Sequence, residues 1–478
     1  MQAHKSLFFI VGVFLLLSVL CFVFPEEGIS IGNITLRFPN LHKVLVKEET
    51  RSVAELLEEP EEEPIMEGLT DSLAYYHRLL DSSDIRFWLP DNDPTFFDSM
   101  FAAMENAKAQ GRTIRILHYG DSQIEMDRLS DRLRDAFQKE FGGGGPGMLP
   151  ILQTIASATV SQYASGALAM KSSYGDSLEL RANGNYGLMT KCFRLEGSAS
   201  ATITASRQPA VPSSFKQFST ITLIFNNRGG QLSATLSSKA SSADPSTQTS
   251  SSEGVQSLSW RLDTCVSQIK LNLSGNADIY CVLVDDGPGV AVDNINMRGC
   301  SGQQFSMVNQ NQLTDSYSLI DIGLIILQFG GNTVPYCNSE KARASYYSTM
   351  EKQIDILRAA CPKARILFIG PSDMSTRHNG ELQSYPGLAA FIEGLRQMAN
   401  SKGCAYWSIY HAMGGHNSMI QWNQENLAGA DYIHFSKKGA ALMGDRMADA
   451  FMRMYGFYQF RKTVPQDQFS QFWGKECR

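Results

Sequence analysis

Four short segments of this chain carry side chains that could do chemistry together. They are Gly120-Asp121-Ser122, Gly299, Gly330-Gly331-Asn332 and Asp431-Tyr432-Ile433-His434. A serine hydroxyl attacks a carbonyl carbon when a neutral imidazole takes its proton and a carboxylate holds the imidazole in the right tautomer. Asp431 precedes His434 by three residues, so one loop can supply both of these partners. The pattern predicts Ser122 as nucleophile, His434 as base and Asp431 as the residue that orients it.

The same segments offer donors for a developing negative charge. Asn332 follows two glycines, which allow backbone and substrate to approach closely, and its side-chain amide can donate to an oxyanion. We expect Ser122 at the N-terminus of the helix after the strand Thr113 to Tyr119, where free N–H groups favour negative charge. The alternatives are structural: Ser122 as a helix cap, Asn332 as a turn residue, and Asp431 as a helix cap on a surface loop.

In this order, the four segments resemble the four blocks of the SGNH/GDSL hydrolases, a family named for Ser, Gly, Asn and His. The resemblance implies an oxyanion hole formed by the backbone N–H groups of Ser122 and Gly299 and the side chain of Asn332. It implies no metal and no organic cofactor. Thr333 departs from the family pattern, in which the third block often continues with Asp. The Gly-x-Ser-x-Gly elbow of another hydrolase fold does not fit, because Ile124 occupies the last glycine position.

Elements that alternate along the chain must position these residues. Short apolar runs predict strands at 113–119, 319–329, 364–369 and 405–410, and apolar periodicity predicts helices around 129–141 and at 342–360, 388–400 and 438–458. Such alternation is typical of an α/β fold, with a parallel sheet covered on both faces and ligands at the carboxyl ends of its strands. The family resemblance implies a flavodoxin-like, three-layer version of that fold.

The composition changes between about Ser165 and about Gly287, where Ser, Thr, Gly and Asn are abundant. Short runs of alternating apolar and polar residues in this stretch suggest antiparallel strands. We interpret this stretch as a β-sandwich inserted into the α/β domain, with a low-complexity loop at Ser237 to Gly254. The expected organisation is a membrane anchor at 1–25, an acidic linker at 26–85, the two halves of the catalytic domain at 86–164 and 288–460 around the insertion at 165–287, and a tail at 461–478.

The anchor prediction depends on Leu7 to Phe24, eighteen uncharged residues preceded by Lys5 and followed by two Glu residues. This length can cross a bilayer, and the flanking charges favour export of the remainder, so we expect a single-pass protein of the cell membrane with its catalytic domain outside the cytoplasm. A cleaved signal peptide is the alternative. Glu48 to Glu67 then holds nine Glu and one Arg, which favours an extended tether with at most a short helix at Val53 to Leu57.

Composition sets further limits. With 43% hydrophobic and 19% charged residues, the chain is neither wholly disordered nor a multi-span membrane protein. The acidic tether alone carries a charge of −8, so the formal net charge of −6 leaves only +2 for the rest of the chain. This balance gives no indication of a nucleic-acid partner. Nine cysteines include no Cys-x-x-Cys pair and no zinc-ligand spacing, and disulfide pairing stays open. Gly142 to Gly147 lacks the residues of a phosphate loop, and we expect it at the rim of the site.

The resemblance extends to peptidoglycan and polysaccharide O-acetylesterases, in which an insertion of this kind is similar to carbohydrate-binding modules. It implies a serine esterase that removes short acyl groups from an O-acylated cell-envelope glycan. An O-acyltransferase that uses a sugar hydroxyl in place of water would need the same residues. A lipase or thioesterase is a further possibility, and so is a non-catalytic glycan-binding envelope protein. The acyl group, the polymer and the oligomeric state stay open.

Overall fold

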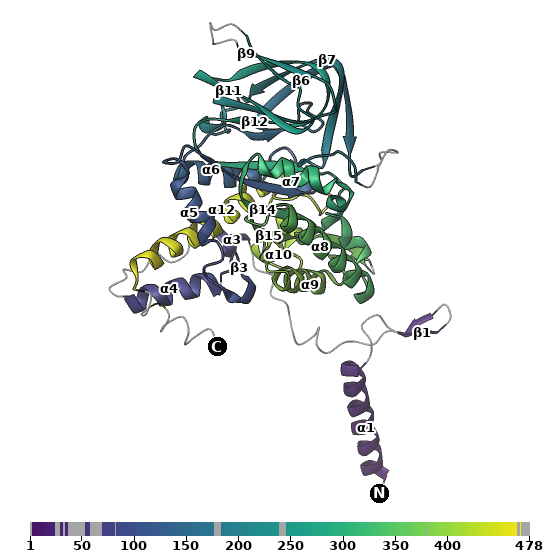
Figure 1. Cartoon of the computed structure of the whole chain (residues 1–478). Coiled ribbons are helices and arrows are strands. Elements are labelled where there is room, and N and C mark those ends of the chain that lie inside the picture. The colour runs from purple at the N-terminus through teal and green to yellow at the C-terminus, as the bar shows by residue number, and fades with distance from the viewer. Residues whose placement is uncertain are drawn as a thin grey trace. The chain divides into compact units, whose positions relative to one another are not determined.

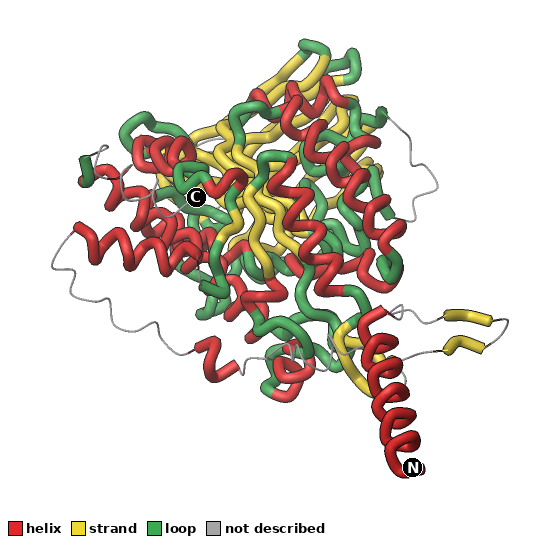
Figure 2. The backbone as a smooth tube through the Cα atoms, turned by 90° about the horizontal axis from the view of Figure 1, so that it is seen from below, coloured by secondary structure: helices red, strands yellow, loops and turns green. Residues whose placement is uncertain are grey.

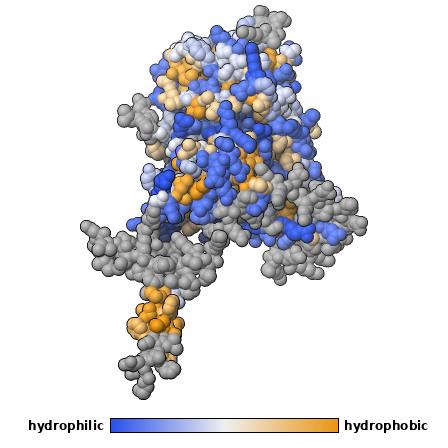
Figure 3. Space-filling view, turned by 180° about the vertical axis from the view of Figure 1, so that it is seen from behind, coloured by the Kyte–Doolittle hydropathy of each residue, from blue (hydrophilic) through white to orange (hydrophobic). Residues whose placement is uncertain are grey.

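The computed structural model describes residues 2–23, 29–31, 34–36, 53–57, 69–81, 83–175, 183–238, 245–378, 380–465 and 469. The chain forms two compact units, Met1–Thr50 and Arg51–Arg478. The first unit contains helix α1 (Gln2–Val23) and the antiparallel strands β1 (Ile29–Ile31) and β2 (Ile34–Leu36). The described side chains of α1 are apolar and largely exposed, from Phe8 to Val19 (Figure 3).

Two predictions concern this N-terminal region. Among the residues that the structure describes, no helix is long and apolar enough to cross a membrane. The expected anchor therefore stays a prediction. Most of the acidic segment Glu48 to Glu67 lies outside the described residues, but the short helix expected there is present as α3 (Val53–Leu57).

The second unit is built on a six-stranded sheet with the order β13-β4-β14-β15-β18-β3. Its strands are β3 (Phe87–Trp88), β4 (Thr113–Gly120), β13 (Gly289–Asn296), β14 (Asp321–Gln328), β15 (Arg365–Gly370) and β18 (Ala405–Ser408). All neighbours are parallel except β3, which pairs antiparallel with β18. The carboxyl ends of the parallel strands therefore meet at one edge of the sheet.

Helices cover both faces of this sheet, and Figure 2 shows its strands lying between them. On one face α5 (Asp98–Ala107), α6 (Ser130–Phe141) and α12 (Lys437–Thr463) pack against alternate strand residues such as Ile116 and Ile326. On the other face α7 (Gln310–Ser318), α8 (Glu340–Ala360) and α9 (Leu388–Ser401) pack against Leu117 and Ile325. The remaining helices are α4 (Leu69–Asp81), α10 (Ile409–Ala412), α11 (Ser418–Gln424), η1 (Pro90–Asn92), η2 (Ser122–Ile124), η3 (Ser213–Phe215), η4 (Gln304–Met307) and η5 (Gly331–Tyr336).

The predicted α/β fold is confirmed, and most predicted elements lie within a few residues of their expected bounds. The predicted strand at 405–410 is shorter, because the chain turns into α10 at Ile409. Strand β13 was not predicted. The expectation for Gly142 to Gly147 is wrong: Gly142 bonds with Val290 at the amino end of β13, away from the carboxyl edge of the sheet. A side chain at Gly143 would lie 2.7 Å from the backbone of Val290, so this glycine allows the close approach.

The inserted β-rich segment is antiparallel throughout, and we call residues 147–285 the β-domain (Figure 1). Its strands are β5 (Gly147–Leu149), β6 (Val160–Ser172), β7 (Lys191–Ala205), β8 (Phe218–Asn227), β9 (Leu232–Ser238), β10 (Ser246–Ser250), β11 (Gly254–Val266) and β12 (Gln268–Asp285). The first part of strand β12 pairs with β7 and β9, and its last part pairs with β8 and β5. It therefore connects these four strands around an apolar core that is separate from those of the α/β part. The strands start before Ser165, and β10 lies inside the stretch expected to be a loop. A small hairpin, β16 (Ser375–His378) and β17 (Glu381–Ser384), lies elsewhere in the unit.

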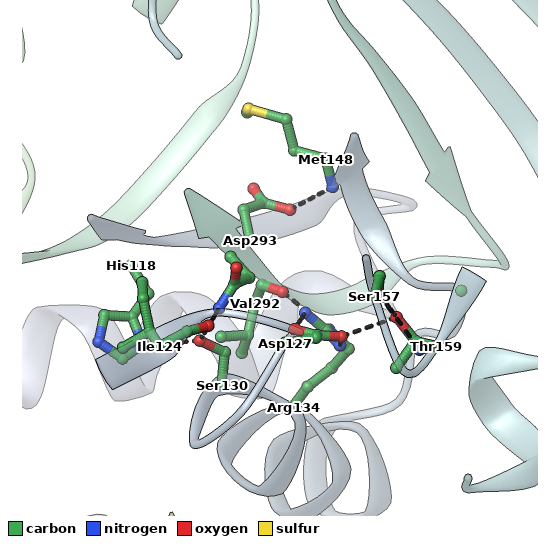
Figure 4. A network of polar contacts seen from close by, with 12 residues as sticks. His118, Ile124, Asp127, Ser130, Arg134, Met148, Ser157, Thr159, Val292 and Asp293 are labelled. Carbon is green, nitrogen blue, oxygen red and sulfur yellow. Dashed lines mark hydrogen bonds and ion pairs between the residues drawn. The ribbon is translucent and has the colours of Figure 1, made fainter. Parts of the chain in front are cut away.

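Buried ion pairs join the β-domain to the sheet. The Arg115 guanidinium on β4 donates to Asp285 at the end of β12 and to Asp293 on β13, with N–O distances of 2.7 to 3.3 Å. Asp293 also accepts a hydrogen bond of 2.8 Å from the backbone N–H of Met148 on β5 (Figure 4). All three charged side chains are at most 10% exposed. The polar cluster therefore fixes the entry and the exit of the β-domain at the same edge strand.

We predict that Arg115→Met lowers the free energy of unfolding by about 3–5 kcal/mol, because it leaves two buried carboxylates without a cation. Arg112→Met is the matched control: the bidentate pair of Arg112 with Asp321 is about half exposed, so its loss should cost no more than about 1 kcal/mol. Urea-induced unfolding of both variants measures the difference. Equal stability of the two variants would contradict a structural role for the buried cluster.

Candidate active site

The residues around Ser122 form what we call the nucleophile loop, residues 121–129. Strand β4 ends at Gly120, and Asp121 then caps the short helix η2 by accepting a 3.0 Å hydrogen bond from the backbone N–H of Gln123. Asp121 is therefore the cap, and the hydroxyl of Ser122, the first residue of η2, is available for another partner. The backbone N–H of Ser122 has no partner within η2, as expected at the start of a helix.

Ser122 starts a helix after β4 as expected, but this helix is the short η2 and not the amphipathic helix expected around 129–141. Helix α6 begins only at Ser130, and three residues between the two helices have left-handed backbone, with φ of 61° at Met126, 65° at Asp127 and 62° at Leu129. The physical reason is the β-domain: Met126 bridges to Ser157, and the Asp127 carboxylate accepts hydrogen bonds from Arg134 and from the Thr159 hydroxyl (Figure 4). The dipole of α6 therefore plays no part at Ser122.

Ser122 and His434 meet although 312 residues separate them in the chain. The Ser122 Oγ lies 2.8 Å from Nε2 of His434, and the Nδ1 of His434 lies 2.7 Å from a carboxylate oxygen of Asp431. The other carboxylate oxygen accepts from the backbone N–H groups of Ile433 and His434. Helix α12 is capped by Ser436, so Asp431 is not its cap. The hydroxyl of Ser122 therefore contacts the imidazole of His434, and the imidazole contacts the carboxylate of Asp431.

Two carboxyl groups of the site have shifted acidities. Partial burial raises the pKa of Asp431, but hydrogen bonds from the side chain and backbone of His434 and the backbone of Ile433 outweigh it, which leaves that pKa below its ordinary value. Asp431 therefore stays ionised beside the imidazole. Burial raises the pKa of Asp121 to about 6, against the hydrogen bond from Gln123 and the nearby His434. Asp121 holds the turn and does not touch the Ser122 hydroxyl through any contact in the described structure.

The predicted oxyanion donors lie in two different positions. Asn332, in helix η5 after β14, lines a cavity together with Ser122 and His434. Its amide donates to the carbonyl of Cys300 at 3.1 Å and approaches a carboxylate oxygen of Asp121 at 3.5 Å, so the weaker contact leaves one N–H that can turn to a substrate. Gly299 lies in a turn with φ of 73° and is not among the described residues that line the cavity. Its proposed role stays a prediction.

The cavity that holds these residues has a volume of about 250 Å³. The apolar part of its lining comprises Phe329, Pro335, Pro371, Met374, Ile409 and Ile433. The polar part includes Asp121, Ser122, Gln123, Asn332, Ser372 and His434. A pocket of this size holds a small acyl group and part of its leaving group, and it is smaller than those that enclose large ligands. The described residues hold no cluster of His, Cys, Asp or Glu with the arrangement of a metal site.

Sequence reasoning missed the side chain that joins the two loops, Gln123. Its amide N–H donates to the carbonyl of Ile433 at 2.7 Å, and its amide oxygen accepts from the backbone N–H of Phe435 at 3.4 Å. One amide thus holds the backbone on both sides of His434. No sequence signal identifies this role, because the partners are more than 300 residues away.

Arg128 supplies a second connection between the loops. Its guanidinium donates to the carbonyls of Ser122 at 2.9 Å, Glu125 at 2.9 Å and Phe435 at 3.1 Å. The buried carboxylate of Glu125 in turn pairs with Arg298, which follows β13. Gln123 and Arg128 therefore hold the backbone of the two segments that carry Ser122 and His434.

We predict that Gln123→Ala lowers kcat by about ten- to a hundredfold and changes KM much less, because the main effect is a misplaced imidazole that slows proton transfer. Gln123→Glu keeps the acceptor for Phe435 but loses the donor to Ile433, so its kcat should also fall. Steady-state hydrolysis of a small aryl acetate measures both constants.

Gln353→Ala is the matched control for this prediction. Gln353 is another buried glutamine, on α8, and accepts a 3.0 Å hydrogen bond from the backbone N–H of Ser306. Gln353→Ala and Gln123→Ala should each lower the free energy of unfolding by about 1–3 kcal/mol, but Gln353→Ala should leave kcat unchanged. An unchanged kcat in folded Gln123→Ala would show that Gln123 does not position His434.

Comparisons with known proteins found one family and several solved structures that are similar to this chain. Residues 274–442 match the GDSL-like Lipase/Acylhydrolase family. A solved structure of a peptidoglycan O-acetylesterase resembles the chain with a TM-score of 0.59 and 20% identity, over 78% of this chain and 99% of that chain. A family two carbohydrate esterase from Cellvibrio japonicus matches 62% of this chain and 98% of that chain, with a TM-score of 0.25 and 10% identity. No curated protein sequence matches this chain.

The matched segment contains Asn332, Asp431 and His434, while Ser122 precedes the β-domain and lies outside it. The fold brings Ser122 to the same carboxyl edge as the matched residues. Residues 274–442 therefore match a GDSL-like lipase/acylhydrolase domain, and this match together with the site geometry supports an SGNH-type esterase.

Proposed function

We propose that this esterase removes O-acetyl groups from a cell-envelope glycan such as peptidoglycan, through an acyl intermediate on Ser122. The observation that carries the proposal is the continuous chain of short contacts from Ser122 through His434 to Asp431, at the wall of the 250 Å³ cavity. Its size favours a short acyl group over a long fatty acyl chain. The fold likeness to a peptidoglycan O-acetylesterase covers 78% of the chain, more than the α/β part alone supplies, and supports the choice of a glycan.

In the proposed mechanism, the Ser122 oxygen attacks the ester carbonyl while its proton passes to Nε2 of His434. Asp431 accepts the N–H on the other ring nitrogen and stabilises the imidazolium that forms. The oxyanion would receive hydrogen bonds from the Asn332 amide and the Ser122 backbone N–H. His434 then protonates the departing sugar oxygen, which leaves as a hydroxyl. In the second half, a water molecule attacks the acyl-serine while His434 takes its proton, and His434 returns that proton to the Ser122 oxygen as acetate leaves.

We predict that Ser122→Ala and His434→Ala each lower kcat/KM for a small aryl acetate by more than about a thousandfold, because each removes a group that acts only as part of the unit. A fluorophosphonate should label the wild type at Ser122 and should not label Ser122→Ala. The controls are Ser345→Ala on the exposed side of α8 and His378→Ala in the hairpin, which should retain wild-type activity.

Acetate release from two acetylated polymers tests the substrate. O-acetylated peptidoglycan should release acetate at a higher kcat/KM than acetylated xylan at equal ester concentration. If the alanine variants keep their activity, the proposed mechanism fails. If only xylan is deacetylated, the mechanism stands and the assignment of a cell-envelope substrate fails.

We further propose that the N-terminal apolar segment holds the enzyme at a membrane, with the catalytic domain outside the cytoplasm. The uncharged run Leu7 to Phe24 and the exposed apolar side chains of α1 support this location. The full chain should sediment with membranes and resist extraction by alkaline carbonate, and a chain without residues 1–25 should not. Recovery of the full chain in the soluble fraction, without cleavage, would contradict the proposal.

A further inference from the structure

A second, smaller cavity lies between the nucleophile loop and the β-domain. Its volume is about 40 Å³, room for a few water molecules or one small polar group. Residues from both parts of the unit line it, among them Asp127, Arg134, Thr159, Lys191, Asn294 and Asn296. It shares no described lining residue with the catalytic cavity. We call it the junction cavity.

The described residues that line the junction cavity include two cationic side chains and one anionic side chain. Asp127 and Arg134 neutralise each other through two hydrogen bonds of 2.6 and 2.9 Å (Figure 4). Lys191, the first residue of β7, is only 4% exposed, and no described residue forms an ion pair or hydrogen bond with its ammonium group. Burial lowers the pKa of Lys191 to about 8, and no nearby carboxylate counters this effect among the described residues. A cation with so little access to water and no partner among the described residues is poorly stabilised, so an anion beside it would bind favourably.

A second polar atom of the cavity also lacks a partner. The side-chain amide of Asn296, at the carboxyl end of β13, donates to the oxygen of Asn294 at 2.9 Å. This contact leaves the Asn296 oxygen buried without a donor. The amide cannot simply be reversed, because the Asn294 amide group already donates to Ile124 and Ser130. A fitting ligand therefore offers a negative charge to Lys191 and a hydroxyl or N–H to Asn296.

The cavity lies close enough to Ser122 for one substrate to reach both. Asp127 follows Ser122 by five residues, so their Cα atoms are at most about 18 Å apart even if the loop were fully extended. Thr154 and Ala156, at the edge of the cavity, are exposed, so the cavity is reached from the surface. A polymeric glycan seated at the catalytic cavity can extend over this distance.

We propose that the junction cavity binds a carboxylate of the glycan substrate through Lys191, with an adjacent hydroxyl or N–H donating to Asn296. This inference rests on the proposed function and specifies its substrate as an acidic glycan. Two kinds of sugar supply this chemistry: one with a carboxylate on a lactyl ether, and one with a uronic acid. Bound water molecules that satisfy both side chains are the alternative.

Calorimetric titration of the full chain with three monosaccharides tests the proposal. The probes are N-acetylmuramic acid, which carries a lactyl carboxylate, glucuronic acid, and the neutral N-acetylglucosamine. We expect at least one acid to bind with a Kd at least tenfold lower than that of the neutral sugar. The acid that binds identifies the source of the carboxylate. Equal Kd values for all three probes would show that the cavity holds only water.

Variants connect the binding to the cavity. Lys191→Met should abolish the preference for the acid, while kcat/KM for the aryl acetate stays within about twofold of wild type. Lys191→Gln provides a second variant that keeps a polar group if the first does not fold. Lys270→Met removes an exposed lysine of the β-domain and should preserve the preference. A preference that survives in both Lys191 variants would overturn the proposal, whereas aryl acetate activity that is retained in Ser122→Ala would contradict the proposed function and leave this binding test unaffected.

Discussion

The side-chain amide of Gln123 is the interaction on which the catalytic geometry depends. The hydroxyl and the imidazole come from loops more than 300 residues apart, and a contact of 2.8 Å between them requires the loops to be held within a fraction of an ångström. Gln123 achieves this by binding the backbone before and after His434, and Arg128 adds bonds to carbonyls in both loops. The positions of both loops are therefore held by an amide and a guanidinium that bind main-chain atoms, which leaves the Ser122 and His434 side chains free to react.

The β-domain has a structural role next to this site. Between Ser122 and α6, the chain adopts three left-handed residues, a conformation that costs energy for residues other than glycine. The compensation comes from Asp127, which binds Arg134 on α6 and Thr159 beside β6, and from the bridge between Met126 and Ser157. Because the contacts with Thr159 and Ser157 cross from one part of the unit to the other, the insertion shapes the loop that carries Ser122. An inserted domain joined only by flexible linkers would have no such effect.

The sequence predicted the parts of this structure that depend on local patterns. Apolar runs located β4 and β14, and residue types along those strands located Ser122 and Asn332 at their ends. Strand β13 was missed because Asp293 and Asn294 interrupt its apolar run, and only the structure shows that Arg115 neutralises the buried Asp293. The late start of α6 was missed for the same reason, since its cause lies in the β-domain. Long-range polar contacts carry no local signal, and the role of Gln123 depends on them entirely.

The contrast between Arg115 and Lys191 explains how one interface can combine rigidity with recognition. Arg115 is buried and contacts two carboxylates, so its charge is satisfied in the free protein and serves to hold the β-domain in place. Lys191 is buried in the same region without such a partner among the described residues, so a negatively charged ligand could stabilise its ammonium group. A cavity of 40 Å³ limits that ligand to a small one. A fixed junction can therefore hold an unpaired cation in place for a ligand, because the neighbouring paired ions supply the stability that the unpaired one takes away.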